Sequence, residues 1–234
     1  MGPVSRRGDE VLRVAGFWTP NVHRLLEACA AAGVDGVPRP LGYADDGRER
    51  LSFVPGVVPA YPMPEWVWGE GVLPDAARLL RRLHDASVGL AALRDGWRSP
   101  VRHPAEVVCH NDFAVYNLVF DGGRLSGVID FDYCSPGPRI WDLAYLAYTL
   151  VPLTGALDAG AFDAPERAAR LERLVGAYGG TFAASDVLPV VVDRLRDLAD
   201  FSDRAAVDLG NPDLHRHAAG YRADAARLAA GHLA

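Results

Sequence analysis

Residues 108–145 read VCHNDFAVYNLVFDGGRLSGVIDFDYCSPGPRIWDLAY, and this stretch decides the fold and the chemistry that we expect of the chain. It begins with the spacing H-x-D-x-x-x-x-N, in which His110, Asp112 and Asn117 are the fixed residues. A second carboxylate, Asp130, follows thirteen residues after the asparagine. Together these four side chains are a far more specific pattern than any one of them alone.

The segment between the asparagine and Asp130 has the pattern of a β-hairpin. Two apolar runs, Leu118–Phe120 and Arg124–Ile129, flank the turn Asp121–Gly123. A glycine-containing turn between two apolar runs predicts paired antiparallel strands. Such pairing returns the second strand to the start of the first, so Asp130 is expected beside Asn117.

These side chains suit phosphoryl transfer. In that reaction a carboxylate, here Asp112, accepts the proton of the acceptor hydroxyl, while Asn117 and Asp130 hold Mg²⁺ against the phosphates. Asp132 lies two residues beyond Asp130, on the same strand face. It is expected to contact the metal or the substrate, and the alternative is a carboxylate that belongs only to a turn.

The stretch resembles the catalytic and metal-binding core of the aminoglycoside phosphotransferase family, a branch of the protein-kinase-like fold that also includes choline kinases. The resemblance continues through Pro136–Arg139 and Trp141–Ala144. It is strong over residues 79–152 and partial over residues 11–56.

The resemblance implies an α+β, protein-kinase-like fold of two lobes. A reduced antiparallel β lobe with one helix is expected over residues 1–56, and a mainly helical lobe over residues 57–234 that carries the catalytic hairpin. It further implies ATP or GTP as co-substrate, Mg²⁺, and an acceptor hydroxyl on a small molecule, either an aminoglycoside or another cationic or polar metabolite.

Four further site residues follow from the resemblance. His110 is expected to orient the catalytic loop through a backbone hydrogen bond, and Asp142 to support the same loop. The carbonyl of Ser52 and the amide of Val54 are expected to contact adenine between the lobes. For these two residues an ordinary strand end is the alternative.

All 24 basic residues of this 234-residue chain are arginines, because the sequence contains no lysine. The strand lysine that grips nucleotide phosphates in the family is matched by Arg13, whose fork geometry differs from that of lysine. Its glutamate partner is missing at the expected helical turn, residues 21–23, and Glu27 lies one turn late. We expect Arg13 to point into the cleft, near Glu27 or another acid. About ten residues precede the strand, too few for a full glycine-rich hairpin.

The pattern along the chain predicts strands first and helices afterwards, as in α+β folds. Thr19 is expected to cap the first helix, with Pro20 at its first position. His84 is expected to be a buried structural histidine and not a metal ligand. The expected strands are residues 11–14, 39–43 and 49–54, and the expected helices are residues 20–32, 74–88, 140–150, 164–178, 185–209 and 212–231.

Composition limits the partners and the setting. The formal net charge of −6 disfavours binding to nucleic acid. Residues 1–10 are charged without an apolar core, so no signal peptide is expected. The longest apolar run, residues 143–153, is too short to cross a membrane. Three cysteines without C-x-x-C spacing fit a reduced cytoplasm.

The acceptor is expected to lie against the C-terminal helices. Asp193, Asp197 and Asp200 fall on one face of a helix and could bind a cationic substrate. The alternative is a solvated face, paired with Arg194, Arg196 and Arg204. Aromatic surface for a cation, or simply core, is offered by Tyr116, Trp141 and Trp68.

Two functions of different classes remain open. The first is an ATP/Mg²⁺-dependent O-phosphotransferase of small molecules. The second is a catalytically silent binding, immunity or resistance protein that keeps the fold, since the short N-terminus also resembles trifolitoxin-immunity-like proteins. A metal-dependent hydrolase ranks below both, because histidine clusters are absent.

Overall fold

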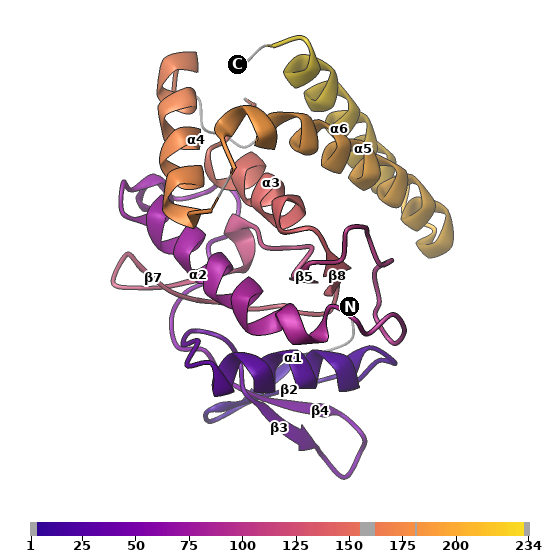
Figure 1. Cartoon of the computed structure of the whole chain (residues 1–234). Helices are drawn as coiled ribbons and strands as arrows, with labels where there is room; N and C mark the ends of the chain where they lie inside the picture. Colours follow the sequence, from indigo (N-terminus) through magenta and orange to yellow (C-terminus); the bar gives the residue numbers. More distant parts are fainter. Residues whose placement is uncertain (1–3, 155–161, 181, 232–234) are drawn as a thin grey trace.

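A four-stranded antiparallel sheet forms the N-terminal end of the molecule in the computed structural model, which describes residues 4–154, 162–180 and 182–231. The strands lie in the order β1-β2-β4-β3, and helix α1 packs beside them (Figure 1). Their bounds are β1 (Ser5–Arg7), β2 (Glu10–Arg13), α1 (Thr19–Ala31), β3 (Pro40–Tyr43) and β4 (Glu49–Ser52).

Two details of this end differ from expectation. Strand β1 adds a fourth strand: it pairs with β2 through a turn at Gly8, whose φ of 60° suits glycine. Thr19 is the first residue of α1 and not its cap, which is Trp18. The Thr19 hydroxyl instead accepts a hydrogen bond from the Gly16 amide at 2.9 Å.

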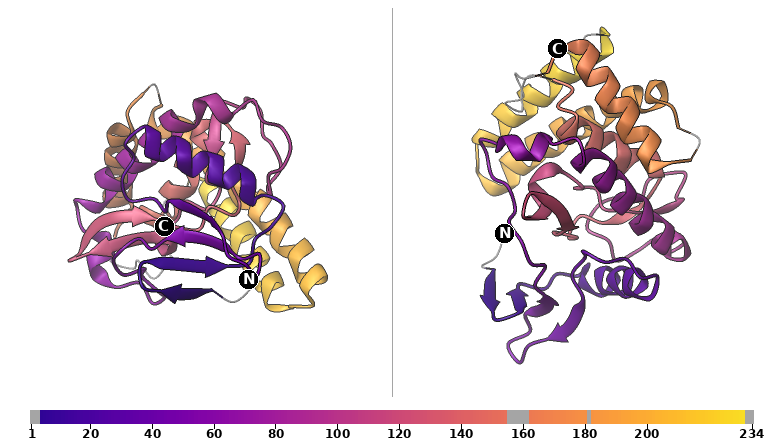
Figure 2. Two further views of the ribbon diagram at one scale, coloured as in Figure 1. Left: turned by 90° about the horizontal axis from the view of Figure 1, so that it is seen from below. Right: turned by 90° about the vertical axis from the view of Figure 1, so that its left-hand side faces the viewer.

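The remainder of the chain is mostly helical, with α3 at its centre and the long α5–α6 pair on one side (Figures 1 and 2). Helix α2 packs against α1, α3 and α4. Its bounds and those of the other elements are η1 (Glu65–Trp68), α2 (Val72–Ser87), η2 (Val88–Leu90), β5 (Val107–Cys109), η3 (Val115–Asn117), β6 (Leu118–Asp121), β7 (Arg124–Val128), β8 (Ser135–Gly137), α3 (Arg139–Leu150), α4 (Ala164–Tyr178), α5 (Ala184–Leu209) and α6 (Asp213–Ala229).

The core follows from the amphipathic patterning of these helices. On α2 the side chains of Leu73, Leu80 and Leu83 are fully buried, while Arg78 and Arg82 on the other face are exposed. Burial of one such leucine contributes about 1.5–3 kcal/mol. Helix α3 is buried along nearly its whole length. Among the described helices, none is long and apolar enough to cross a membrane.

The expected catalytic hairpin is present. Strands β6 and β7 pair antiparallel, with Leu118 opposite Val128. The turn residues Gly122 and Gly123 have φ of 54° and 78°, the positive values that a two-residue hairpin turn of type I′ requires. The hairpin packs closely on the N-terminal end, because the amide of Val128 donates to the Gly36 carbonyl at 2.8 Å.

Strands β5 and β8 were not expected. Each has three residues, and they pair antiparallel with Val107 opposite Gly137. Cys109 ends β5 directly before the catalytic loop, and β8 leads into α3. This small ribbon therefore fixes the loop to the helix that supports it.

Candidate active site

Both carboxylate oxygens of Asp112 are held by neighbouring side chains. The Tyr116 hydroxyl donates to Oδ1 at 2.8 Å, and the Asn117 amide nitrogen donates to Oδ2 at 2.8 Å. Burial raises the pKa of Asp112, and the hydrogen bond from Tyr116, His110 and the bond from Asn117 oppose that rise only in part. The side chain is thus fixed in one orientation and has gained affinity for a proton.

The amide of Asn117 is fixed by the same contacts. Its nitrogen also donates to the Asp112 carbonyl at 2.9 Å. Because the nitrogen faces Asp112, the amide oxygen is the end left to act as a metal ligand. The backbone carbonyl of Asn117 accepts from the Ile129 amide at 3.0 Å, which brings the residue before Asp130 beside Asn117, as the hairpin pattern predicts.

Two site residues have left-handed backbone conformations. Asn111 has a φ of 62° and Asp130 a φ of 67°. Residues with a β-carbon rarely adopt this region, although Asn and Asp tolerate it best. Outliers of this kind gather at functional sites, where the surrounding contacts hold them.

Asp142 supports the catalytic loop from α3. One carboxylate oxygen accepts from the backbone amide of His110 at 2.5 Å, and the other accepts from the amide of Asn111 at 2.8 Å. Burial opposes ionisation of Asp142, but hydrogen bonds from His84 and from the His110 backbone outweigh it and lower the pKa. A buried anion here is held by three donors.

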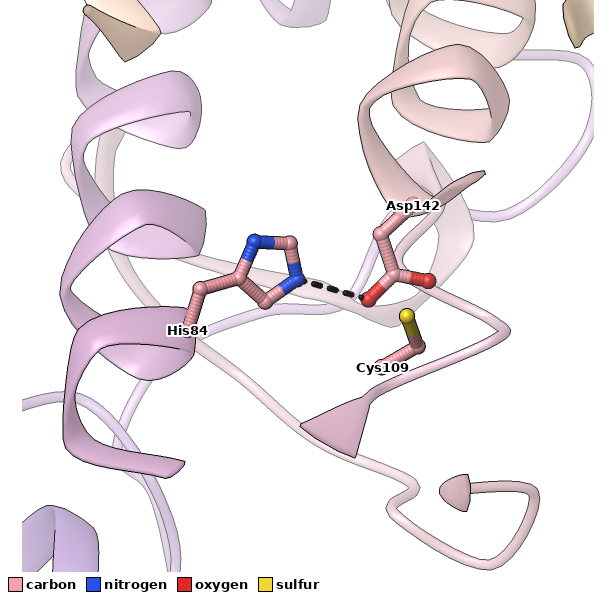
Figure 3. Close-up of side chains that lie close together, drawn as sticks. All are labelled: His84, Cys109 and Asp142. Carbon is pink, nitrogen blue, oxygen red and sulfur yellow. Dashed lines mark hydrogen bonds and ion pairs between the residues drawn. The ribbon is translucent and has the colours of Figure 1, made fainter. Parts of the chain in front are cut away.

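The third donor is His84 of α2, which lies 3.1 Å from the Asp142 carboxylate (Figure 3). The other ring nitrogen of His84 meets the Tyr178 hydroxyl at 2.8 Å. The expectation that His84 is a buried, hydrogen-bonded residue is therefore confirmed. It joins α2, α3 and α4 behind the loop.

His84, Cys109 and Asp142 offer ligand atoms within 4.8 Å of one another. Burial raises the pKa of the Cys109 thiol well above its ordinary value, so the sulfur keeps its proton at neutral pH. The Asp142 oxygens are already used by hydrogen-bond donors. The three side chains act as a buried support, and they do not have the chemistry of a metal centre.

His110 also uses both ring nitrogens within the loop. Its Nδ1 accepts from the Asp112 amide at 3.2 Å, and its Nε2 lies 3.2 Å from the Ile129 carbonyl. The ring thus ties the catalytic loop to the end of β7. This is the contact expected of a loop-orienting histidine, and its importance for activity stays a prediction.

A cleft of about 580 Å³ lies between the N-terminal sheet and the catalytic hairpin. It contains the three residues expected to contact a nucleotide and two of those expected to bind a metal. Its lining comprises Val4, Arg6, Val11, Arg13, Val14, Trp18, Pro38, Leu51, Ser52, Phe53, Val54, Gly56, Val58, Arg98, Val119, Ile129, Asp130 and Asp132.

Arg13 points into this cleft and contacts three acids. Its Nε lies 2.5 Å from Glu49, Nη2 lies 2.8 Å from Asp132, and Nη1 lies 3.7 Å from Asp130. Burial works against the charged form of Arg13, but Glu49 and Asp132 outweigh it and raise the pKa of Arg13. Arg13 therefore stays charged and faces the carboxylates at one end of the cleft.

The buried partner of Arg13 is Glu49 of β4. Glu49 sits directly opposite Arg13 in the β2–β4 register and also accepts from His23 of α1 at 2.9 Å. Glu27 is exposed on α1, so the acid near Arg13 comes from a strand. The sequence could have suggested Glu49 only if the strand register had been known.

Asp130 and Asp132 fit a hard divalent cation chemically. Both side chains are mostly buried at the cleft and are balanced by arginines, Arg13 for both and Arg98 for Asp132. Carboxylate and amide oxygens are the ligands that Mg²⁺ prefers. Asp130, Asp132 and Asn117 therefore have the chemistry that a Mg²⁺ site needs. Their role as metal ligands stays a proposal.

The three aspartates on α5 are already paired with arginines. Asp193 contacts Arg196, Asp197 contacts Arg102 and Arg194, and Asp200 contacts Arg222. Pairing with arginines is what the alternative interpretation, a solvated helix face, predicts. The partners include Arg102 and Arg222, which lie outside α5. A role for these carboxylates in binding an acceptor stays a prediction.

Fold and site together define a class, the two-lobed kinase-like phosphotransferases. A model of the phosphotransferase enzyme family matches residues 88–188. The trifolitoxin immunity protein of Rhizobium leguminosarum bv. trifolii is 31% identical over 186 residues, which span 75% of this chain and 70% of that relative. The chain belongs to this phosphotransferase family.

Solved structures show the same fold at low identity. A choline/ethanolamine kinase family protein from Mesorhizobium loti superposes with a TM-score of 0.64 at 20% identity, covering 97% of this chain and 85% of that one. Amicoumacin kinase, solved with AMP-PNP, Ca²⁺ and Ami, gives a TM-score of 0.67 at 11% identity, with 95% and 87% coverage. The α+β, protein-kinase-like fold expected from the sequence is confirmed.

Proposed function

We propose that the protein is a kinase of a small molecule, which transfers the terminal phosphoryl group of ATP or GTP to a hydroxyl group with Mg²⁺ bound at the site. Membership of the phosphotransferase family supports the class of reaction. The observation that carries the proposal is the cleft itself. It gathers Arg13, Ser52, Val54, Asp130 and Asp132, all chosen from the sequence. Ile129 of the lining donates through its backbone amide to the Asn117 carbonyl, which ties the cleft to the loop that holds Asp112.

Asp112 would receive the acceptor hydroxyl. As the acceptor oxygen bonds to the terminal phosphorus, the bond from phosphorus to the leaving nucleoside diphosphate breaks, and the hydroxyl proton passes to the carboxylate. Tyr116 and Asn117 hold that carboxylate still. Positioning of this kind accounts for much of the rate when the transition state is loose.

Asp130, Asp132 and the amide oxygen of Asn117 would hold Mg²⁺, which neutralises charge on the phosphates when bound. Arg13 faces the same end of the cleft and would contact phosphate oxygens. Its contact with Asp132 is then exchanged for one with the nucleotide. Glu49, which lies on the far side of the guanidinium, would keep the arginine in place.

The apolar part of the cleft suits a purine base. Leu51, Val119 and Ile129 give it apolar walls. The carbonyl of Ser52 and the amide of Val54 lie where β4 ends, and they would supply the hydrogen bonds that orient the base. Backbone contacts of this kind do not by themselves select ATP over GTP.

The acceptor is proposed to be a small polar molecule. Asp193, Asp197 and Asp200 could receive a cationic group only by giving up their arginine partners. A cationic aminoglycoside-like acceptor therefore draws less support from the structure than the nucleotide does. A reducing cytoplasm as the setting stays a prediction from the cysteines, which are buried thiols in the structure.

A catalytically silent immunity protein is the second candidate. Both oxygens of Asp112 are used by neighbours, and the β1–β2 hairpin has three and four residues in its strands. The relative at 31% identity carries the name of an immunity protein. In that case the cleft would bind a ligand without transferring phosphate.

A thermal-shift titration of the wild-type protein tests the proposal. ATP and GTP are added with and without Mg²⁺, since a ligand that binds the folded state must raise the unfolding midpoint. A rise with a nucleoside triphosphate that is larger with Mg²⁺ supports the kinase. No rise with either nucleotide up to millimolar concentration contradicts it.

A further inference from the structure

Arg98 is an arginine of the cleft that neither the sequence patterns nor the comparisons single out. It follows η2 in the loop that leads to β5, and it lines the cleft together with Arg13 and Arg6. Arg6 lies over the Phe53 ring at 3.5 Å from its centroid, and its Nε donates to the Gly8 carbonyl at 2.7 Å. Arg98 is therefore the second cation at the carboxylate end.

Two aromatic rings hold the guanidinium of Arg98. It lies 4.5 Å from the ring centroid of Trp18 and 4.3 Å from that of Tyr133. Stacking uses the faces of the planar guanidinium and leaves its N–H edges to donate hydrogen bonds. The side chain is one-third exposed and lines the cleft.

The segment directly before Arg98 is anchored by two side-chain hydrogen bonds. The Trp97 indole nitrogen donates to the Leu93 carbonyl at 2.9 Å, and Asn21 of α1 donates to the Asp95 carbonyl at 2.8 Å. The backbone before Arg98 is thereby tied to the N-terminal part.

The acid that Arg98 faces is shared with Arg13. Arg98 lies 3.4 Å from Oδ2 of Asp132, whereas Arg13 lies 2.8 Å from Oδ1 of the same residue. A charge-assisted hydrogen bond is usually about 2.7–2.9 Å long. The Arg98 contact is longer than that, so little is lost when its N–H groups turn to another anion.

We propose that Arg98 is a second phosphate-binding residue, which contacts the terminal phosphate of the nucleotide beside Asp132. This rests on the proposed function. Arg13 grips the phosphates from the N-terminal sheet, and Arg98 approaches from the loop before the catalytic hairpin. In a chain without lysine and with a short β1–β2 hairpin, the two arginines together neutralise the charge that the cleft must accept.

The test is a comparison of ATP, ADP and AMP, whose affinities for wild type and Arg98→Ala are measured by calorimetry with Mg²⁺ present. Loss of a charge-assisted contact should weaken ATP binding about ten- to a hundred-fold, while AMP binding changes by less than about three-fold. Arg204→Ala, an exposed arginine of α5, is the matched control and should bind all three as wild type does. Far-UV circular dichroism confirms that each variant is folded, and Arg98→Gln replaces Arg98→Ala should the latter not fold.

Two results overturn the proposal while leaving the kinase intact. In the first, Arg98→Ala binds ATP as tightly as the wild type. In the second, the affinities of Arg98→Ala for ATP, ADP and AMP fall by the same factor. Arg98 then maintains the structure of the cleft and does not contact the terminal phosphate. A wild-type protein that binds none of the three nucleotides overturns the proposed function itself.

Discussion

The catalytic loop and the N-terminal sheet hold their charges in opposite ways. Behind the loop, Asp142 is fully buried and accepts from His84 and from two backbone amides. In the cleft, the side chains of Arg13, Asp130 and Asp132 are mostly buried but keep 14%, 19% and 17% of their surface exposed. The loop is thus built in its final geometry, while the cleft keeps contacts that a charged ligand can exchange.

The catalytic loop and the N-terminal sheet also differ in how closely they follow the family pattern expected from the sequence. The loop keeps every residue of the catalytic pattern, supported by helices α2, α3 and α4. The sheet has an arginine in place of a lysine, and the acid beside it comes from β4 and not from a helix. A fully buried network of several donors tolerates few substitutions, whereas a cluster of charges that is partly open to solvent can be rebuilt with other residues.

The largest expected effect is on turnover and concerns Asp112. Asp112→Asn removes the group that orients the acceptor hydroxyl and receives its proton, so single-turnover phosphate transfer should fall about 100- to 10,000-fold. Nucleotide affinity should stay within about three-fold of wild type. Tyr116→Phe removes one hydrogen bond to the carboxylate but keeps the acid, so its transfer rate should fall by a smaller factor. An Asp112→Asn protein that transfers phosphate at the wild-type rate would be incompatible with this role.

The next effect is on stability and tests the buried support of the loop. Asp142→Ala leaves His84 and two backbone amides without an acceptor, so the free energy of unfolding should fall by about 3–5 kcal/mol. The control is Asp85→Ala, an exposed acid of α2 paired with Arg81 and Arg139, which should lose less than about 1 kcal/mol. Equal losses in urea titrations of the two variants would remove the contrast between loop and surface.

The same acid should give the protein a defined response to pH. The pKa of Asp142 is lowered in the folded state, so its charge stabilises the fold above the ordinary aspartate pKa of about 3.9. That contribution is lost as the pH falls through the lower, folded value. The stability difference between wild type and Asp142→Asn should therefore be constant from neutral pH to about pH 5 and shrink below about pH 4. If the stability difference between the two proteins grew on acidification, the pKa of Asp142 would be raised in the folded state and not lowered.

A smaller effect is expected in the cleft. Arg13→Gln keeps a hydrogen-bond donor near Glu49 but removes the charge that faces the phosphates, and ATP affinity should fall about ten-fold or somewhat more. Arg50 on the neighbouring strand pairs with Glu10 and does not line the cleft, so Arg50→Gln serves as the control. Should both variants bind ATP equally well, Arg13 is no phosphate contact, and the silent immunity protein becomes the better account.

Local sequence patterns predicted the catalytic hairpin because its information is contained in consecutive residues. Apolar runs and a glycine turn determine both strands and the positions of Asn117 and Asp130 at one end. The same holds for helices such as α4, whose residues 164–178 were predicted to the residue and whose start is fixed by a capping box at Asp163 and Glu166. The bounds of the two lobes, residues 1–56 and 57–234, stay a prediction.

Long-range contacts explain what the sequence did not reveal. Glu49 meets Arg13 only through the β2–β4 register, and Arg98 meets Asp132 across thirty-four residues. Strands β1, β5 and β8 have three residues each, too short for a periodic pattern. The Tyr116 bond to Asp112 depends on the turn of η3, which hydropathy does not indicate.

In the proposed function the cleft binds a nucleotide through a divalent cation held at Asp130. The direct measurement is the Mg²⁺-dependent part of the thermal shift produced by ATP, compared between wild type, Asp130→Ala and the control Asp208→Ala, an exposed acid near the end of α5. We predict that Mg²⁺ increases the ATP-induced shift in the wild type and in Asp208→Ala and adds nothing in Asp130→Ala. The same Mg²⁺-dependent increase in Asp130→Ala as in the wild type would contradict the account.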